Sequence, residues 1–513
     1  DDSAERAVAE LRPLLTAAYG SSVGSLKSYY MPGTLGPSVS FNQMIDGWEW
    51  AYYPGVNFFD PDAFIATAGI TLTGHARLQR ETRDVVLFSL RAMSPQNQVP
   101  HHFDSEKGTQ LHPSAQYTAL SGARQPGPNF FTVLAGMYYV RYSGDYPFVC
   151  EHYGLLDRAV SYILSLVDPR MNLLDAPGPL MIDTLRRTGF TADNNIFMVG
   201  FMNDYANFLS EFSAALNQPA FSQMCATRRT DAGDAITAMM LSSRSEELRA
   251  AAGKVNASIN ANMWTSDHYA SEAQKGAKWG RDMKDHDANF LALAFGVAGH
   301  KRAKQLTTFL ANLHCPHSPS DVYYGSRETY GGNVGDSDVR LARVALAEAW
   351  ARAAVGDAGG LADVLRPIRE EVEGSVYMYE RYGCGRPGMK GNGEHSPYFF
   401  EWPSVFVIGR VTLEYGIRLG ITTVDISPLR QEPFRYITEK FFVVFDRSKG
   451  ACVCLQMLPL RRTISVGGLI PGSTLSVVGS DATEETVTVG PNGRATTAAL
   501  CGIEHCVCLL TRS

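Results

Sequence analysis

Acidic side chains stand in two loop-like stretches that lie far apart in the chain. The first stretch is "MIDTLRRTGFTADNN" (residues 181–195), where Asp183 lies mid-loop behind three apolar residues. An apolar setting raises the pKa of a carboxyl group, as a general acid at neutral pH requires. A salt bridge with Arg186 or Arg187 is the structural alternative for Asp183, and we favour the general acid.

The second stretch is glycine-rich and holds three glutamates. It reads "YMYERYGCGRPGMKGNGEHSPYFFEWPSV" (residues 377–405) and contains Glu380, Glu394 and Glu401. Hydrolysis of a glycosidic bond needs two carboxyl groups, one that protonates the leaving oxygen and one that activates water or attacks directly. Asp183 together with one of these glutamates meets that need.

An aromatic stretch near the start of the chain has side chains that suit a sugar. "DGWEWAYYPGVNFFDPDAF" (residues 46–64) holds Trp48 and Trp50 together with Asp60. Flat aromatic faces with nearby acids fit the CH faces and the hydroxyl rim of a sugar ring. A packed aromatic cap beneath the loop is the structural alternative, with Asp62 capping the next helix.

Polar residues also stand before predicted helices elsewhere in the chain. In "SGARQPGPNFF" (residues 121–131), Arg124 and Gln125 are donors for hydroxyl groups, whereas Asn129 fits a helix cap. Asp193, in the first stretch, likewise fits an N-cap.

A helix also begins with polar residues in "WGRDMKDHDANFLALAFGVAG" (residues 279–299). These residues are Asp285, Asp287 and Asn289. No further ligand set accompanies the Asp-His-Asp sequence, so structural or substrate-binding roles are favoured over a metal site.

The elements that must position these residues are mostly helical. Short Gly, Pro or Asn breaks between helical patterns indicate hairpins, which we expect to close into a toroid. From about residue 430, alternating stretches bounded by turn residues predict the strands of a small β-sandwich. Period-3.6 patterns cover residues 3–20, 62–92, 115–120, 128–143, 147–167, 194–216, 232–263, 287–298, 301–312, 338–355, 359–373 and 402–419.

These features resemble the six-hairpin, (α/α)6-barrel glycosidases, especially the trehalase-like and glucosidase-I-like glycoside hydrolases of families 37 and 63. The similarity covers roughly residues 40–420 and rests on "DTLRRTGFTADNN", on the run from Glu380 to Gly383, on "GNGEH" and on "FFEW" at residues 399–402. The resemblance implies that Asp183 is the general acid, Glu380 the general base, and Glu394 a substrate contact.

The same resemblance implies inversion of the anomeric configuration, with a water molecule between Glu380 and the anomeric carbon. The sequence departs from the family pattern at two places. Asp183 follows Met-Ile in place of the Gly-Trp that usually precedes the acid, and the amino-terminal trehalase signature is missing. The chain therefore resembles a separate branch of these glycosidases, and the resemblance does not imply trehalose as the substrate.

We accordingly expect an (α/α)6 toroid followed by a small C-terminal β-sandwich. Residues 1–60 form an N-terminal helix and aromatic-rich loop region joined to the toroid, residues 61–425 the catalytic barrel, and residues 426–513 the sandwich domain. The expected activity is an exo-acting, inverting glycoside hydrolase in which Asp183 donates a proton and Glu380 activates water. The expected substrate-binding residues are Trp48, Trp50, Asp60, Arg124, Gln125, Arg187, Asp287, Glu394, Glu401 and Trp402.

This mechanism needs no cofactor and no metal, and the partner is an oligosaccharide, a polysaccharide end or a small glycoside. Three alternatives stay open, because a fold does not fix a function. They are a carbohydrate phosphorylase, a polysaccharide lyase that uses His101-His102 or His268-Tyr269, and a non-catalytic carbohydrate-binding protein.

Composition narrows the remaining possibilities. The 513 residues are 45% apolar with a net charge of −6, and no basic run is present, which disfavours a nucleic-acid partner. No apolar run reaches about 18 residues, so no transmembrane helix is predicted. The chain begins at Asp1, as a mature or trimmed form would, and we favour a secreted or lumenal location over a cytoplasmic one. The sequence leaves the oligomeric state open.

The cysteines show no metal-binding pattern. Cys452 and Cys454 alternate in one predicted strand, and Cys506 and Cys508 do so in another. Each pair therefore points to one face of its strand. One or two cross-strand disulfides beside Cys501, or buried free thiols, are both compatible with this spacing.

Overall fold

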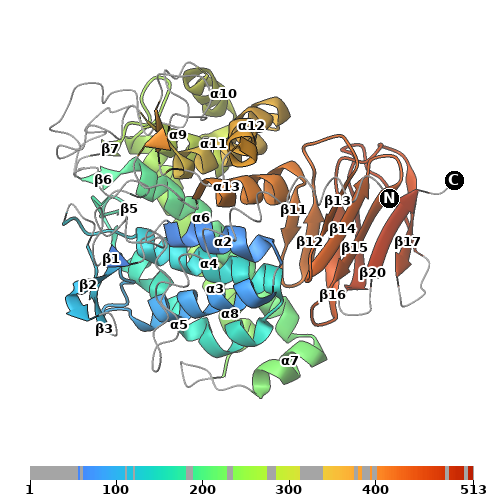
Figure 1. Ribbon diagram of the computed structural model, residues 1–513, viewed down its shortest axis with the longest axis horizontal. Helices are drawn as coiled ribbons and strands as arrows, with labels where there is room; N and C mark the ends of the chain where they lie inside the picture. Colours follow the sequence, from blue (N-terminus) through green and yellow to red (C-terminus); the bar gives the residue numbers. More distant parts are fainter. Residues whose placement is uncertain are drawn as a thin grey trace.

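The computed structural model of the protein describes a helical part followed by a strand-rich part (Figure 1). The described residues are 56–57, 62–74, 76–109, 112–118, 122–178, 180, 189–227, 235–273, 285–311, 339–374, 379, 381–383, 393–394, 401–479, 485–501 and 506–511. Twelve α-helices, α2 to α13, lie within these ranges. The helix expected over residues 3–20 lies outside them.

Six of the helices contact one another in a closed cycle, in the order α2, α4, α6, α9, α11, α13 and back to α2. They are therefore the inner helices of a ring. Their bounds are α2 (Asp62–Leu72), α4 (Gly127–Ser143), α6 (Ala192–Leu216), α9 (His286–Ala294), α11 (Ala342–Ala354) and α13 (Glu401–Ile408), which continues as the π-helix η3 (Gly409–Glu414).

Most residues of the inner helices are buried, whereas the outer helices bury mainly one face. Every residue of α13 is buried. In α8 the buried residues recur every three or four positions, at Leu241, Ser245, Leu248, Ala252, Val255 and Ile259. One apolar stripe is what a surface helix needs, and apolar residues all round are what a core helix needs. The outer helices are α3 (Ala76–Arg91), α5 (Tyr146–Ser165), α7 (Pro219–Ala226), α8 (Ala238–Asn262), α10 (Gly299–Leu310) and α12 (Ala358–Gly374).

The two ends of the ring differ in their connections. Chain segments that lead from an inner to an outer helix are short, at 73–75, 144–145, 217–218, 295–298 and 355–357. Segments that return to the next inner helix are long, at 92–126, 166–191, 263–285, 311–341 and 375–400. The inner helices therefore all begin at one end of the ring, which we call the loop end.

The long connections carry short strands. In Figure 1 these strands lie at the left, opposite the C-terminal sheets. Three strands pair in the order β1-β2-β3 and three in the order β10-β9-β8, while β4 pairs with β5 and β6 with β7. The bounds are β1 (Val56–Asn57), β2 (His102–Thr109), β3 (His112–Gln116), β4 (Val167–Asp168), β5 (Leu173–Leu174), β6 (Phe190–Thr191), β7 (Glu272–Ala273), β8 (Val339–Leu341), β9 (Arg381–Gly383) and β10 (Gly393–Glu394).

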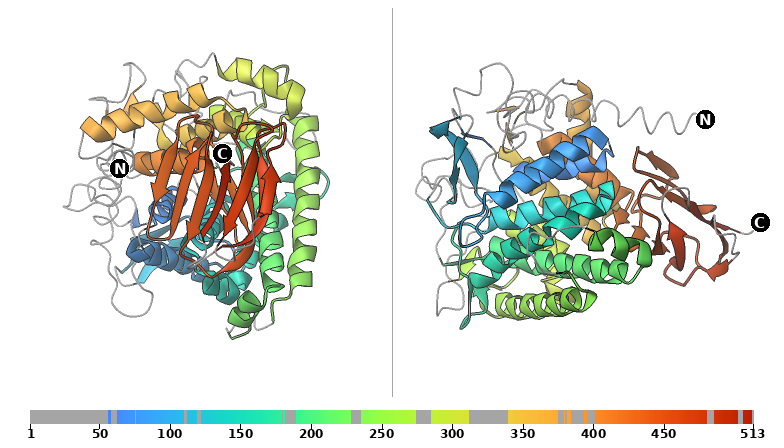
Figure 2. Two further views of the ribbon diagram at one scale, coloured as in Figure 1. Left: turned by 90° about the vertical axis from the view of Figure 1, so that its right-hand side faces the viewer. Right: turned by 90° about the horizontal axis from the view of Figure 1, so that it is seen from below.

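The C-terminal strands form two sheets across the other end of the ring (Figure 2). One has the order β11-β12-β16-β19 and the other the order β13-β14-β15-β20-β17-β18. Strand β19 contacts β15, β17, β18 and β20, so the two sheets meet along it. Their bounds are β11 (Ile417–Leu419), β12 (Thr423–Ile426), β13 (Phe434–Ile437), β14 (Phe441–Asp446), β15 (Gly450–Leu455), β16 (Leu460–Val466), β17 (Thr474–Gly479), β18 (Glu485–Thr488), β19 (Ala495–Cys501) and β20 (Cys506–Thr511).

Three predicted helices differ from the structure. The pattern over residues 62–92 divides into α2 and α3 at a turn where Gly74 has a φ of 69°. Residues 115–116 belong to strand β3, because they pair with β2, and do not begin a helix. The pattern over 402–419 ends as helix at Glu414, and the first strand of the C-terminal sheets starts at Ile417.

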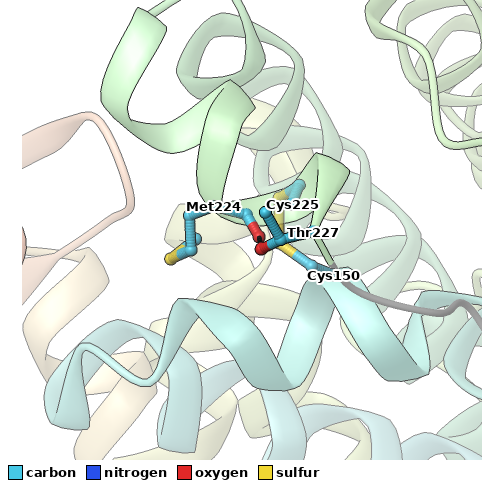
Figure 3. Close-up of a disulfide and its surroundings, with 4 residues drawn as sticks. All are labelled: Cys150, Met224, Cys225 and Thr227. Carbon is cyan, nitrogen blue, oxygen red and sulfur yellow. Dashed lines mark hydrogen bonds between the residues drawn. A yellow bond between two sulfur atoms is a disulfide. The ribbon is translucent and has the colours of Figure 1, made fainter.

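Disulfides occur in both parts of the molecule. Cys150 of α5 is bonded to Cys225 of α7, which fastens two outer helices together (Figure 3). Cys452 and Cys454 are also disulfide-bonded. The strand register sets Cys452 opposite Cys508 and Cys454 opposite Cys506. The free-thiol alternative is therefore wrong for Cys452 and Cys454.

Candidate functional site

Buried polar side chains gather where the inner helices begin, at the loop end of the ring. Each of them is at most 7% exposed, although a helix start beside a long loop is normally a solvated place. Buried polar groups are held by hydrogen bonds, so this concentration indicates a built site. Its members are Gln125, Asn129, Asp193, Asn194, Asn195, Asp285, His286, Asp287, Asn289, Arg343 and Glu401.

Three asparagines hold the loops that precede their helices, and all three do so in the same way. The side-chain oxygen of Asn129 accepts from Val99 N–H at 2.9 Å, and its amide donates to Asn97 C=O at 2.9 Å. Asn195 accepts from Leu174 N–H at 2.7 Å and donates to Leu174 C=O at 3.3 Å.

The third member, Asn289, accepts from Tyr269 N–H at 2.9 Å and donates to Tyr269 C=O at 3.2 Å. In all three cases the amide pairs with loop backbone much as a neighbouring strand would. We call these three residues the asparagine clamps.

Two neighbours of Asn195 fix the segment that leads to Asp183. Asp193 accepts from Leu180 N–H at 2.8 Å, and the Asn194 amide donates to Ala176 C=O at 3.1 Å and Gly178 C=O at 2.5 Å. The N-cap predicted at Asp193 is wrong, because Thr191 is the residue before the helix and Asp193 reaches across to the loop. The cap predicted at Asn129 is wrong for the same reason, since Pro126 occupies that position.

Arg124 supports the same segment from the other side. Its guanidinium donates to Asp175 C=O at 2.6 Å, and its own carbonyl accepts from Gly178 N–H at 3.0 Å. A Cβ on Gly178 would lie 2.5 Å from that carbonyl oxygen, so only glycine permits this approach. The Arg124 side chain is half exposed, and the neighbouring Gln125 is fully buried.

A buried ion pair stands at the start of the last two inner helices. Arg343 Nε lies 3.4 Å from Glu401 Oε1, and Glu401 is fully buried. Trp402 is also fully buried and packs edge-on against Tyr382, with ring centroids 5.6 Å apart. Glu401 and Trp402 therefore form part of the wall of the site and present no free face in this structure.

Strands β9 and β10 place the backbone of one predicted glutamate, Glu394, and the residue that follows another in the sequence. Glu394 pairs with Arg381, and Glu380 is the residue immediately before Arg381. The Tyr382 hydroxyl donates to Glu371 at 3.4 Å and accepts from Tyr379 N–H at 2.9 Å. Burial raises the pKa of Tyr382 well above its ordinary value, so its hydroxyl stays protonated.

The start of α9 places a further acid at this end. Asp287 is 1% exposed and accepts from Ala288 N–H at 2.8 Å. Asp193, Asp287 and Glu401 all lie in the first turn of an inner helix. The positive end of the helix dipole stabilises a carboxylate at this position. Because several helices begin here, the loop end stabilises oxygen atoms that carry negative charge or accept hydrogen bonds.

The structure describes only part of the predicted site. Arg124, Gln125, Asp287, Glu401 and Trp402 lie at the loop end as given above, and Glu394 is placed through its backbone. Among the described residues, no group of three or more His, Cys, Asp or Glu side chains is arranged to hold a metal ion. No described helix is long and apolar enough to cross a membrane. The predicted residues outside the described ranges are Trp48, Trp50, Asp60, Asp183, Arg187 and Glu380.

Sequence reasoning missed Arg343 and the loop-holding roles of Asn194 and Asn195. The signal for the clamps was present, because "PNF", "NNIF" and "ANF" recur at three helix starts. For Arg343 there was no such signal, since its partner Glu401 is remote in the chain.

Comparison with solved structures identifies the fold. The GH78 rhamnosidase of Bacillus sp. GL1 superposes on 87% of this chain with a TM-score of 0.52 at 14% identity, and this chain spans 39% of the rhamnosidase's length. The GH63 mannosylglycerate hydrolase of Thermus thermophilus matches 77% of this chain and 99% of its own, with a TM-score of 0.49 at 12% identity. The neutral trehalase of Saccharomyces cerevisiae matches 69% of this chain and 71% of its own, with a TM-score of 0.43 at 13% identity.

No protein family and no curated protein matches the sequence itself. At such low identity the likeness concerns the fold alone. The helical ring, with its twelve described helices and its long connections gathered at one end, is the fold of the six-hairpin glycosidases.

Proposed function

We propose that the protein is a glycoside hydrolase whose active site lies at the loop end of the ring. The observation that supports this best is the concentration of buried polar residues where the inner helices begin, in a fold that glycosidases share. A carbohydrate ligand suits such a site, because sugar hydroxyls need many donors and acceptors held in fixed directions.

Asp183 serves as the general acid and Glu380 as the general base. The acid gives its proton to the glycosidic oxygen, and the base takes a proton from water as the water attacks the anomeric carbon, so the configuration inverts. Support for Asp183 comes from Asp193 and Asn194, which hold the backbone up to Leu180, three residues before it. Support for Glu380 comes from the β9–β10 hairpin, which begins at the next residue.

The remaining predicted residues shape the sugar subsites. Trp48 and Trp50 stack on sugar faces, and Asp60, Arg124, Gln125, Arg187, Asp287 and Glu394 address the hydroxyls. Glu401 and Trp402 act from within the wall, since both are buried. The long loops that ring the site favour exo action on a small glycoside or a chain end.

Two further features complete the proposal. The disulfide-bonded cysteines described above, in both the helical and the strand-rich part, favour an oxidising and hence secreted or lumenal setting. We also propose that the two C-terminal sheets close as a sandwich along β19, because buried and half-buried residues alternate along β14.

The proposal is tested by a screen of chromogenic glycosides, followed by Asp183→Asn and Glu380→Gln on the best substrate. Each variant should lose roughly 10³-fold or more in kcat while it stays folded, because each removes one half of the acid–base pair. Glu246→Gln, at an exposed acid on the outer helix α8, is the matched control and should keep wild-type turnover.

Nuclear magnetic resonance of the first-formed sugar should show the inverted anomer. Near-native turnover in either variant would exclude that residue, and a retained anomer would exclude the water mechanism. Turnover that requires phosphate would identify a phosphorylase, and an unsaturated product that absorbs in the ultraviolet would identify a lyase.

A further inference from the structure

A cavity lies inside the ring and opens towards the C-terminal sheets. Its volume is about 450 Å³, and its wall comes from α2, α4, α6, α9, α11 and η3 and from residues in or just after the first two C-terminal strands. Residues Ala294, Trp350 and Thr412 belong to the last turns of α9, α11 and η3. The cavity therefore lies inside the ring and reaches the carboxyl ends of these helices, whereas the polar residues of the candidate active site stand at the amino ends.

Phenylalanine rings that contact one another form one side of the cavity. The rings of Phe64 and Phe131 lie 5.8 Å apart, those of Phe131 and Phe197 5.3 Å apart, and those of Phe197 and Phe295 5.7 Å apart. These rings come from α2, α4 and α6 and from the residue that follows α9, and three of them face the cavity.

Aromatic rings make up a substantial part of the cavity wall. Phe201, Phe295 and Trp350 line it together with Phe64 and Phe197. Flat rings of this kind bind another ring through stacked or edge-to-face contacts. The volume lies within the range of about 300–1,000 Å³ that is typical of small-molecule sites.

One region of the wall is polar, but its charges are already paired. Asp204 lies 2.9 Å from Arg141, and Arg418 lies 3.0 Å from Asp425. The Tyr138 hydroxyl lies close enough to Asp204 and Arg418 to interact with both electrostatically, and it makes no hydrogen bond with the residues that the structure describes. Because the charges are paired, this region favours an uncharged hydroxyl group, which both donates and accepts.

We propose that this cavity binds a small, uncharged aromatic molecule that bears a hydroxyl group, with its ring against the aromatic wall and its hydroxyl beside Tyr138. This binding site goes beyond the proposed hydrolase activity.

The proposal is tested with 2-naphthol as the probe, by fluorescence titration and calorimetry on the full chain. Wild-type protein should bind one equivalent of probe. Tyr138→Phe keeps the ring and removes the hydroxyl, so it should weaken binding by about fivefold. Naphthalene, which lacks the hydroxyl, should bind both proteins equally.

A second pair of variants locates the probe. Ala353 lines the cavity, so Ala353→Phe should fill it and abolish binding. Ala250→Phe adds the same ring on the exposed face of α8 and should bind as the wild type does. Thermal melting checks that each variant is folded.

Three results would overturn the proposal. The first is that 2-naphthol does not bind the wild-type protein. The second is that 2-naphthol binds Ala353→Phe as tightly as the wild type. The third is that the wild-type protein binds glucose but not 2-naphthol, and that Ala353→Phe abolishes the binding of glucose.

Discussion

At the scale of single residues, the asparagine clamps explain how long loops can be fixed above a helical ring. Each clamp joins a helix start to loop backbone through two hydrogen bonds, as Asn195 does with Leu174. An amide is suited to this because it carries an acceptor and a donor side by side. Aspartate at the same place could accept but could not donate.

Asn195→Ala should lower the free energy of unfolding by about 3 kcal/mol, because it leaves both buried backbone groups of Leu174 without their partner. Asn203→Ala, an exposed position on the same helix, should change it by less than about 0.5 kcal/mol. Urea unfolding followed by circular dichroism measures both. Equal losses in the two variants would show that the clamp contributes nothing.

His101 makes stability depend on pH. Burial, assisted by the neighbouring His102, lowers the pKa of His101 from 6.5 to about 3. Between these values the unfolded chain binds a proton that the folded chain does not. Stability should therefore fall as the pH drops through this window, by up to about 1.4 kcal/mol per pH unit from this group.

His101→Gln removes that proton uptake, so the free energy of unfolding should depend less steeply on pH between about 6 and 4 than in the wild type. His300→Gln alters an exposed histidine and should keep the wild-type slope. Unfolding curves at several pH values give both slopes, and identical slopes for wild type and His101→Gln would contradict the assignment.

At the scale of elements, helix packing depends on glycine where two inner helices approach closely. A Cβ on Gly200 of α6 would lie 2.3 Å from the ring of Phe295, whereas a Cβ on Gly253 of the outer helix α8 would meet nothing within 4 Å. The same substitution should therefore have opposite signs at the two positions.

Gly200→Ala should destabilise the protein by about 1–3 kcal/mol through overpacking. Gly253→Ala should stabilise it by about 0.5–1 kcal/mol through better helix propensity. Thermal melting of the two variants decides the matter. A stabilised Gly200→Ala protein would mean that Phe295 moves aside at little cost.

Local pattern was enough to predict most helices, since the periodicity over 128–143 and 301–312 lies within two residues of α4 and α10. The sequence pattern gave the wrong element where contacts with a distant part of the chain, or a required turn, determine the backbone conformation. Residues 115–116 become strand only because β2 lies beside them, and the helix after Glu401 ends early because the chain must turn at Gly416, where φ is 61°. Nor does pattern reveal that Cys150 meets Cys225, since each sits in an ordinary helical stretch.

At the scale of the whole molecule, the C-terminal sheets hydrogen-bond directly to the short-turn end of the ring. The Tyr142 hydroxyl donates to Ile417 C=O at 3.0 Å, and the Tyr436 hydroxyl donates to Leu72 C=O at 2.6 Å. Arg462 donates to the Tyr146 hydroxyl at 2.8 Å. These contacts cross from one part to the other at several helices, so we expect the two parts to unfold as one cooperative unit.

Glu211 of α6 provides a direct test of that coupling. Its carboxylate accepts from Ile421 N–H at 2.9 Å, in the turn between β11 and β12, and from the Thr423 hydroxyl at 2.7 Å, at the start of β12. All six tryptophans of the chain precede residue 403, so their fluorescence reports on the helical part and not on the sheets.

Glu211→Ala leaves the buried Ile421 N–H without its partner and should lower the free energy of unfolding by about 2 kcal/mol. Because the two parts are coupled, this loss should appear in the tryptophan fluorescence transition, and calorimetry should still show one peak. Glu246→Ala, an exposed acid on α8, should leave the midpoint unchanged. If Glu211→Ala splits off a separate sheet transition while the fluorescence midpoint stays in place, the ring is stable without its sheets.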